Sequence, residues 1–431
     1  MFNVTIVGAG YVGLTLAIHL ANKGVKVLAV DKNIKIIEKL NRGECPIFEE
    51  SLKDPLHLSI KSGNLNFSTN FPEGGCSHWI LAVSYFPGDK SHYIDLLGEI
   101  KGTEQEAPTI MIRGTVPVGY ISNTILPALE KQFKSKNNNK FYLASTPERS
   151  LSGNALEELT NLPQLIGATK ESYEKASLVY KKANITCIHL PNIEAGEIAK
   201  SFTNFARLVQ FNLANYLGAL CHKFNVSDEL MLASIKDNYP RLDFLNKPGP
   251  GVGGFCLPKD SLVLYDGVTE LFERNNELDQ FIEFPSQQFH LNQSIIYFHA
   301  ELTYNMVKDR EKIVAFGMAF KGMPKTDDTR DSTGVAIVKK LIEKKINVFV
   351  KDITVDKEKM IEQNLPVADE NDLKDFDAVL ILNNDPDYKK YILEHIDNLV
   401  GETFDLYDPW RLIVRPEQSI FQKSFEKKKL I

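Results

Sequence analysis

The sequence predicts an α/β protein in which two largely parallel sheets are joined by a long central helix. Three observations support this fold class. Short apolar segments alternate with helical stretches over residues 4–146, an amphipathic segment without strand signal follows at 194–223, and the alternation resumes near residue 311. Strands that alternate with helices imply crossover connections, and crossovers give parallel sheets. Because 431 residues exceed one ordinary core, two or three domains are expected.

The expected strands are the short apolar runs bounded by turn residues or helical stretches. They cover 4–10, 25–31, 78–83, 108–114 and 140–146 in the first half, and 312–320, 346–352, 376–383 and 402–408 in the last third. The segment 194–223 keeps helical periodicity throughout and would be about 45 Å long as one helix. A helix of that length can bridge two domains, and it can also pair with its copy in a dimer.

Composition and charge exclude several classes of partner. A formal net charge of −6, with both signs scattered along the chain, provides no basic surface for nucleic acid. The longest apolar runs are too short to cross a bilayer, and MFNVTIVGAG begins a strand rather than a signal peptide. The five cysteines have wide, irregular spacing, which predicts free thiols in a reducing cytoplasm and no metal site.

A glycine-rich turn follows the first expected strand. Gly8, Gly10 and Gly13 have GxGxxG spacing, which permits a tight turn, close approach of a pyrophosphate and close packing of helix on strand. The helix N-terminus offers N–H groups to phosphate. Asp31 ends the second strand, where an acid accepts a ribose 2′-hydroxyl and repels a 2′-phosphate. The pattern predicts a Rossmann-like domain that binds NAD rather than NADP, and from this motif alone FAD stays an alternative.

The segment PGPGVGGFCLPKD, residues 248–260, places four glycines and three prolines around one thiol. The following residues are typical of a helix with Pro258 in its first turn, so Cys256 is expected near a helix N-terminus, where the dipole stabilises a thiolate. Asp260 follows four residues later, about one helical turn. A nucleophile beside an acid–base group suits covalent catalysis, although a buried structural cysteine is the common alternative. NAD and a thiol together indicate oxidation through a thioester.

Seven motifs, in order, resemble the UDP-glucose/GDP-mannose dehydrogenase family. They are GAGYVG, LNRGECPIFEESL (40–52), TVPVG (115–119), PER (147–149), the helix with Lys200 and Asn204, GPGVGGFCLPKD (249–260) and GMAFKGMPKTDDTRDS (317–332). The resemblance spans nearly the whole chain. It implies an NAD-dependent enzyme that oxidises the 6-hydroxymethyl group of a nucleotide sugar to a carboxylate in two steps, for polysaccharide precursor synthesis.

The resemblance also implies how the carbon that reacts is held between the two steps. Cys256 captures the aldehyde from the first oxidation as a thiohemiacetal, and the second oxidation gives a thioester. Lys200 and Asn204 are four residues apart on the long helix and share a face, where the resemblance implies that they stabilise the oxyanion.

Three further residues match family positions near the reacting carbon. Thr115 and Asp260 match the pair that holds or activates the water for thioester hydrolysis. Glu148, in PER, matches a glutamate assigned to acid–base work. One departure lies in AVSYFPGD (82–89), where the family's Thr-Pro is Phe86-Pro87, so a hydroxyl near the cofactor is lost.

The family's binding residues carry over to both ends of the chain. The cofactor-binding residues implied by the resemblance are Gly8, Gly10, Tyr11, Val12, Gly13, Asp31, Thr115 and Arg330. The substrate-binding residues are Glu148, Lys200, Asn204, Arg241, Gly253, Lys321 and Arg411. Arg241, in YPR, matches an arginine that crosses to the partner subunit's sugar site, so a homodimer is expected.

We therefore expect three domains. They are an NAD-binding Rossmann domain at 1–193, a helical dimerisation domain with the cysteine loop at 194–305, and a nucleotide-sugar-binding α/β domain at 306–431. Some segments resemble members that act on UDP-N-acetylhexosamines and FCLPKD resembles those that act on UDP-glucose or GDP-mannose, so a UDP-sugar is favoured over GDP-mannose. The competing hypotheses are a β-hydroxyacid-type dehydrogenase, which would need neither the thiol nor the last domain, and a catalytically retired regulator.

Overall fold

The computed structural model describes residues 3–89, 92–135, 140–151, 153–369 and 372–429. The chain divides into two compact units. The first contains residues 1–204 and 259–285, and the second contains residues 205–258 and 286–431. Each unit has its own sheet, and each is described by itself below.

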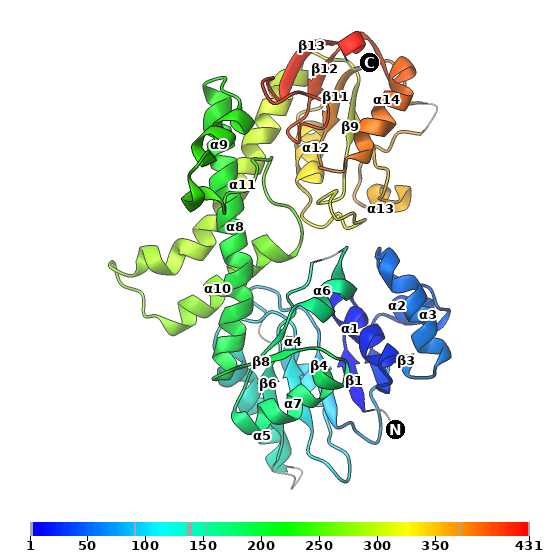
Figure 1. Ribbon diagram of the computed structural model, residues 1–431, viewed down its shortest axis with the longest axis vertical. Helices are drawn as coiled ribbons and strands as arrows, with labels where there is room; N and C mark the ends of the chain where they lie inside the picture. The colour runs from blue at the N-terminus through cyan, green and yellow to red at the C-terminus, as the bar shows by residue number, and fades with distance from the viewer. Residues whose placement is uncertain (1–2, 90–91, 136–139, 152, 370–371, 430–431) are drawn as a thin grey trace. The chain divides into compact units, whose positions relative to one another are not determined.

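The first unit is built on an eight-stranded sheet of order β3-β2-β1-β4-β5-β6-β7-β8 (Figure 1). Its strands are β1 Val4–Val7, β2 Val27–Val30, β3 Leu65–Ser68, β4 His78–Leu81, β5 Thr109–Ile112, β6 Tyr142–Ser145, β7 Gln164–Gly167 and β8 Cys187–Leu190. All neighbours pair in parallel except β6 and β7, which are antiparallel. The five strands expected here are present. The sequence interpretation missed β3, β7 and β8.

Both faces of this sheet are buried. Alternate residues of one strand belong to different apolar cores: Ile80 packs in one core, whereas Trp79 and Leu81 pack in the other. Successive side chains of a strand point to opposite faces, so helices must cover both. The helices are α1 Tyr11–Asn22, α2 Ile34–Asn41, α3 Lys53–Lys61, α4 His92–Leu97, α5 Leu126–Ser135, α6 Ala155–Asn161 and α7 Lys170–Lys182. Two-sided burial explains why the strands are nearly continuous hydrophobic runs.

The middle of the chain is helical, as expected. The long helix α8 runs Ile193–Lys223, one residue longer than the predicted segment. It is followed by α9 Asp228–Lys236, the 3₁₀ turn η3 Pro240–Leu242, α10 Cys256–Leu271 and α11 Asp279–Val307. The divisions between the two units fall within α8, α10 and α11.

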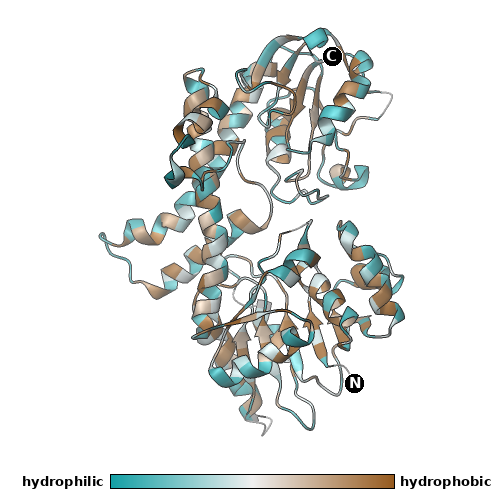
Figure 2. Cartoon of the chain, viewed as in Figure 1, coloured by the Kyte–Doolittle hydropathy of each residue, from teal (hydrophilic) through white to brown (hydrophobic). Residues whose placement is uncertain are grey.

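The second unit carries a five-stranded sheet of order β10-β9-β11-β12-β13 (Figure 1). Its strands are β9 Ile313–Phe316, β10 Val348–Lys351, β11 Phe376–Ile381, β12 Val400–Tyr407 and β13 Phe421–Glu426, with α12 Thr333–Glu343, α13 Lys357–Glu362 and α14 Asp387–Leu399. The four expected strands pair in parallel. The fifth, β13, was not predicted and pairs antiparallel with β12. In Figure 2 the central strands carry the hydrophobic residues.

The predicted fold class is therefore confirmed: two mostly parallel sheets and a helical middle segment that includes the 31-residue α8. In the part of the chain that the structure describes, no helix is long and apolar enough to cross a membrane.

Candidate active site

The GxGxxG turn connects β1 to α1, and its three glycines have different surroundings. Gly8 has φ +100°, and a Cβ there would lie 2.7 Å from the carbonyl oxygen of Ala82. A Cβ on Gly13 would overlap the backbone of Gly8. Gly10 is exposed, with no atom within 4 Å of its Cβ position. The first and third glycines are thus required by the fold, and the second leaves the start of α1 open to a pyrophosphate.

Asp31 follows β2 at the carboxyl edge of the sheet and is bonded to the same turn. Its Oδ2 accepts the Ala9 N–H at 2.8 Å and its Oδ1 accepts the Asn33 N–H at 2.8 Å. A carboxylate has about four acceptor sites, so it can also accept ribose hydroxyls. The chain therefore presents a fixed acid beside an open helix N-terminus, and the residues present fit a dinucleotide with a free 2′-hydroxyl.

Tyr11 and Val12 are the first residues of α1, and the Tyr11 side chain contacts residues outside this helix. Its hydroxyl lies 3.1 Å from Glu49 Oε2 and 3.1 Å from the Leu151 carbonyl oxygen. Glu49 also accepts the N–H of Gly153 at 2.8 Å. Sequence reasoning did not single out Glu49, although it lies in a quoted family motif. The three contacts tie the cofactor turn to the loop after Glu148.

A polar cluster surrounds Asp260, one turn into α10. Asp260 is 1% exposed. Its Oδ2 accepts a hydrogen bond from Asn204 Nδ2 at 2.6 Å and one from the Thr115 hydroxyl at 3.4 Å, and Lys259 Nζ lies 2.7 Å from Oδ1. Lys200 lies one turn before Asn204 on α8. The structure thus brings together three of the predicted catalytic residues, a carboxylate, an amide and a hydroxyl that suit the positioning of a water molecule.

Glu148 lies after β6 and is buried, not solvent-exposed as a lone loop carboxylate would be. Its Oε1 accepts the N–H groups of Arg149 and Ser150 at 2.8 and 2.6 Å, and its Oε2 is ion-paired with the buried Arg113. Arg113 in turn donates to Gln164 at 2.7 Å. Burial lowers the pKa of Arg113. Both oxygens of Glu148 have partners within the protein, so acid–base work by this residue, which stays a prediction, requires an exchange of partners.

The cysteine loop packs on the segment 317–333 of the second unit. The Gly254 N–H donates to the Asp331 carbonyl oxygen at 3.2 Å. A Cβ on Gly253 would lie 2.9 Å from that oxygen, and a Cβ on Gly254 would lie 2.7 Å from the Phe320 ring. The resemblance implies that Gly253 binds the substrate, and that role stays a prediction. Asp331 and Phe320 occupy the space beside Gly253 and Gly254, and Cys256 is exposed as the first residue of α10.

Arg330 and Lys321, both predicted binding residues, lie where the cysteine loop packs on the segment 317–333. The Arg330 guanidinium stacks 4.8 Å from the ring centroid of Phe255 and makes a bidentate bond to Asp328. The Asp328 carboxylate raises the pKa of Arg330, and the Cys256 charge adds to that effect. Lys321 Nζ lies 5.4 Å from the Phe320 ring centroid. Gly253, Cys256, Lys321 and Arg330, predicted from distant motifs, therefore gather in one unit.

The other two predicted substrate arginines have different surroundings. Arg241 is exposed on η3, with its guanidinium 5.4 Å from the Tyr239 ring centroid. The Arg411 side chain, 9% exposed, forms an ion pair with Asp228 at 2.5 Å and lies 3.4 Å from Glu229. It also donates to two backbone carbonyl groups. The Arg411 guanidinium thus already holds the loop after β12 onto α9, and its substrate role stays a prediction.

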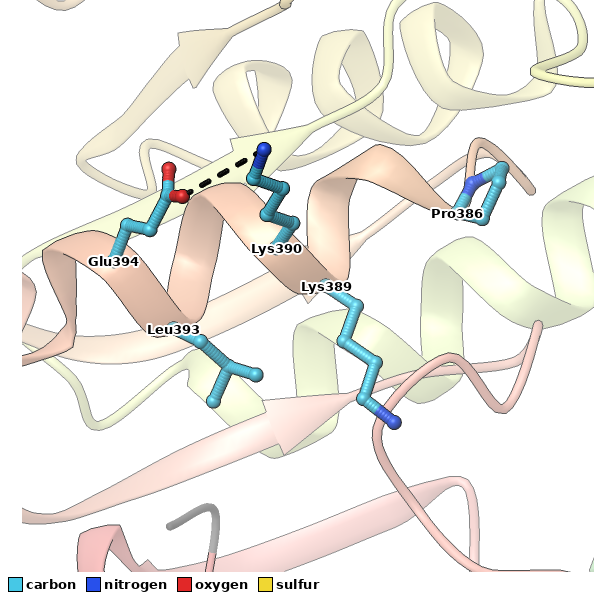
Figure 3. Close-up of a pocket in the computed structure, with 5 residues that line it drawn as sticks. All are labelled: Pro386, Lys389, Lys390, Leu393 and Glu394. Atoms are coloured by element: carbon cyan, nitrogen blue, oxygen red, sulfur yellow. Dashed lines mark ion pairs between the residues drawn. The ribbon is translucent and has the colours of Figure 1, made fainter.

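The described residues contain no group of three or more histidine, cysteine or acidic side chains placed to hold a metal ion. The surface of α14 has an open hollow of about 460 Å³, lined by Pro386, Lys389, Lys390, Leu393 and Glu394 (Figure 3). Every lining residue belongs to this helix or precedes it, and Lys390 pairs with Glu394 at 3.9 Å. One solvated helix face does not form a binding site.

Comparison with known proteins identifies the family. Residues 2–184 match the NAD binding domain of the UDP-glucose/GDP-mannose dehydrogenase family, residues 194–283 match its central domain, and residues 314–415 match its UDP binding domain.

Three relatives illustrate the similarity. A UDP-N-acetyl-D-mannosamine dehydrogenase of Methanococcus vannielii is 28% identical over 410 residues, covering 92% of this chain and 89% of that protein. A putative UDP-glucose 6-dehydrogenase of Bacillus subtilis is 29% identical over 362 residues, covering 81% of each chain. The solved UDP-N-acetyl-mannosamine dehydrogenase Cap5O of Staphylococcus aureus matches with a TM-score of 0.73 at 29% identity, over 88% of each chain. The protein belongs to the UDP-glucose/GDP-mannose dehydrogenase family and is an NAD-dependent nucleotide-sugar dehydrogenase.

Proposed function

We propose that the enzyme oxidises the 6-hydroxymethyl group of a UDP-N-acetylhexosamine, UDP-N-acetylmannosamine foremost, to a carboxylate through a covalent bond to Cys256. The observation that carries the substrate class is the similarity, over most of the chain, to proteins from Methanococcus vannielii and Staphylococcus aureus that are named for UDP-N-acetylmannosamine. The family's UDP binding domain at 314–415 supports the uridine diphosphate end of that substrate.

The chemistry follows from the position of Cys256. Bound NAD supplies the hydride acceptor for both oxidations. The first hydride leaves the sugar alcohol carbon while the hydroxyl proton is released, which gives an aldehyde. The Cys256 thiolate, at the start of α10, adds to the aldehyde carbon, and the alkoxide that forms takes up a proton to give a thiohemiacetal. Loss of a second hydride and of the hydroxyl proton gives a thioester, so that four electrons have left the sugar carbon.

Hydrolysis of the thioester is assigned to the cluster around Asp260. Water adds to the acyl carbon, the carbon–sulfur bond breaks, and the carboxylate and the Cys256 thiolate are released. Asp260 is proposed to accept the proton of that water and Thr115 to help hold it, because the two side chains share a hydrogen bond at 3.4 Å. One amide hydrogen of Asn204 is used by Asp260. Its other hydrogen and the Lys200 ammonium are the proposed donors to the oxyanion.

We also propose that the enzyme works in the cytoplasm as a homodimer through the exposed face of α8. Leu213, Tyr216 and Leu220 follow one stripe of this helix, and Phe224, which is 76% exposed, comes directly after its last residue. Contiguous apolar surface of this kind marks a protein interface. Arg241 is exposed and is the residue proposed to reach the partner's sugar site. Phe224→Glu should shift the sedimenting species toward monomer, and an unchanged dimer would place the interface elsewhere.

The substrate is tested by a panel of UDP-N-acetylmannosamine, UDP-N-acetylglucosamine, UDP-glucose and GDP-mannose, each with NAD, while NADH is followed. The expected result is the highest kcat/KM for UDP-N-acetylmannosamine. A preference for GDP-mannose would contradict the proposed substrate class. Binding of a nucleotide sugar without turnover of any would contradict the proposed catalysis.

A further inference from the structure

Glu197 is a buried carboxylate on α8 that the proposed chemistry does not use. It is 3% exposed. It lies three residues before Lys200 and seven before Asn204, so all three are fixed by one helix. Its Oε2 accepts the Gly119 N–H at 2.7 Å and its Oε1 accepts the Ile121 N–H at 2.9 Å. Both oxygens therefore bind the backbone of one short segment.

That segment leads from the predicted catalytic threonine. TVPVG ends at Gly119, which has φ +87°, and the π-helix η2 runs Ile121–Ile125. The first N–H groups of a helix have no intrahelical partner. A carboxylate at this point accepts their hydrogen bonds and interacts favourably with the helix dipole. Glu197 thus fixes the end of the loop that begins at Thr115.

The loop that begins at Thr115 and the helix α8 are also joined through Asp260. Thr115, from the loop, and Asn204, from α8, both donate to Oδ2 of Asp260. The chain therefore forms a closed ring of contacts: the loop binds Asp260, Asp260 binds α8, and Glu197 on α8 binds the end of the loop. Without Glu197 the ring is open, and the loop can shift while Asn204 stays in place.

We propose that Glu197 is a positioning residue for thioester hydrolysis, which holds Thr115 in register with Asp260 and Asn204. This inference rests on the proposed function, because it concerns the step assigned to that cluster. A small displacement of a water-holding group lowers the rate of a step that depends on geometry, while binding of the two substrates is little affected. The hydrolytic step should therefore be more sensitive to Glu197 than either hydride transfer.

The burial of this carboxylate agrees with such a role. Burial raises the pKa of Glu197 to about 7, the two backbone N–H groups oppose that rise, and the neighbouring Glu194 adds to it. A hydrophobic residue would fill the same space without that desolvation cost. The chain has a carboxyl group here whose only two described side-chain hydrogen bonds are those to the Gly119 and Ile121 N–H groups.

The test compares Glu197→Gln and Glu197→Asp with the wild type. Glutamine keeps the shape but turns an N–H₂ group toward one of the two backbone donors, and aspartate keeps the charge but is one methylene shorter. Ser201→Ala is the matched control, because Ser201 is buried on the same helix and its hydroxyl donates to the Glu197 and Ile198 carbonyl oxygens of that helix, which are its only bonds among the described residues. Single-turnover experiments with NAD and the UDP-sugar measure the rate of NADH formation and the lifetime of the acyl group on Cys256.

The expected result is an acyl lifetime that is longer by about tenfold or more in Glu197→Gln, the cost of a lost bond to a charged group. Glu197→Asp should be intermediate, Ser201→Ala should match the wild type, and the KM values and the first NADH burst should change less than about twofold. Equal lifetimes in all four proteins would overturn the inference, as would a uniform loss of every step. If Glu197→Gln does not fold, the Glu197→Asp lifetime decides. Absence of any acyl group in the wild type would refute the proposed function instead.

Discussion

Replacing Gly254 by alanine should destabilise the cysteine loop and lower the activity, because the substitution carries two separate free-energy costs. Gly254 has φ +91°, a conformation that costs an L-residue about 1–2 kcal/mol. The added Cβ would also lie 2.7 Å from Cδ2 and Cε2 of Phe320, closer than carbon atoms approach, and such overpacking costs about 1–3 kcal/mol. The sum is about 2–5 kcal/mol, a large part of the stability of a typical domain.

The cost is measured by urea unfolding and by steady-state NADH formation. We expect a lower urea midpoint for Gly254→Ala, a fall in kcat of at least about tenfold, and a smaller change in the KM for NAD. Gly401→Ala is the matched control, because Gly401 lies in β12 with no atom within 4 Å of its Cβ position. Alanine there should be neutral or slightly stabilising.

A double variant separates the two costs. Phe320→Ala removes the ring that the new methyl group would meet, so adding Gly254→Ala to it should cost only the strain of the positive φ, about 1–2 kcal/mol. Wild-type stability and activity in Gly254→Ala would refute the reasoning. So would an equal cost of Gly254→Ala with and without the Phe320 ring, because the overlap would then play no part.

Three further predictions concern the cofactor turn and the buried acid. Gly13→Ala should abolish NAD binding in calorimetry, because its Cβ would overlap the backbone of Gly8; retained affinity would contradict the assigned packing role. Asp31→Ala should weaken NAD and raise the ratio of NADP to NAD activity, since a charge that repels a 2′-phosphate is removed; an unchanged ratio would contradict the ribose assignment. The folded-state pKa of Glu197 is about 7, above its ordinary value of 4.5, so the folded state holds the proton more tightly. Stability should therefore fall as pH rises from about 4.5 to 7, by about 1–3 kcal/mol more in wild type than in Glu197→Gln; parallel urea midpoints from pH 4.5 to 7.5 would contradict this.

The fold was predictable where a local pattern determines it. The strands β1 and β2 and the helix α8 follow from runs of apolar residues and from one helical periodicity, and the GxGxxG spacing places the cofactor turn. The strands β7 and β8 were missed because neither has a long apolar run: β7 is Gln164–Gly167 with the sequence QLIG, and the edge strand β8 has no buried residue. Their pairing is decided by the tertiary structure.

The site was predictable only in part, for a related reason. Asp260, Asn204 and Thr115 were found through family motifs, and the structure brings them into hydrogen-bond contact. The packing of Phe320 on Gly254 and the bonds of Glu197 to the backbone join residues 66 and about 77 positions apart, and no local pattern signals such contacts.

The central proposal is that Cys256 carries the sugar as an acyl group between the second hydride transfer and hydrolysis. It is tested most directly by counting NADH formed per UDP-sugar consumed while the mass of the Cys256 peptide is followed after acid quenching. We expect two NADH per sugar and a transient acyl mass on Cys256, with no such mass in Cys256→Ser. One NADH per sugar, or two NADH per sugar at an undiminished rate in Cys256→Ser, would contradict it.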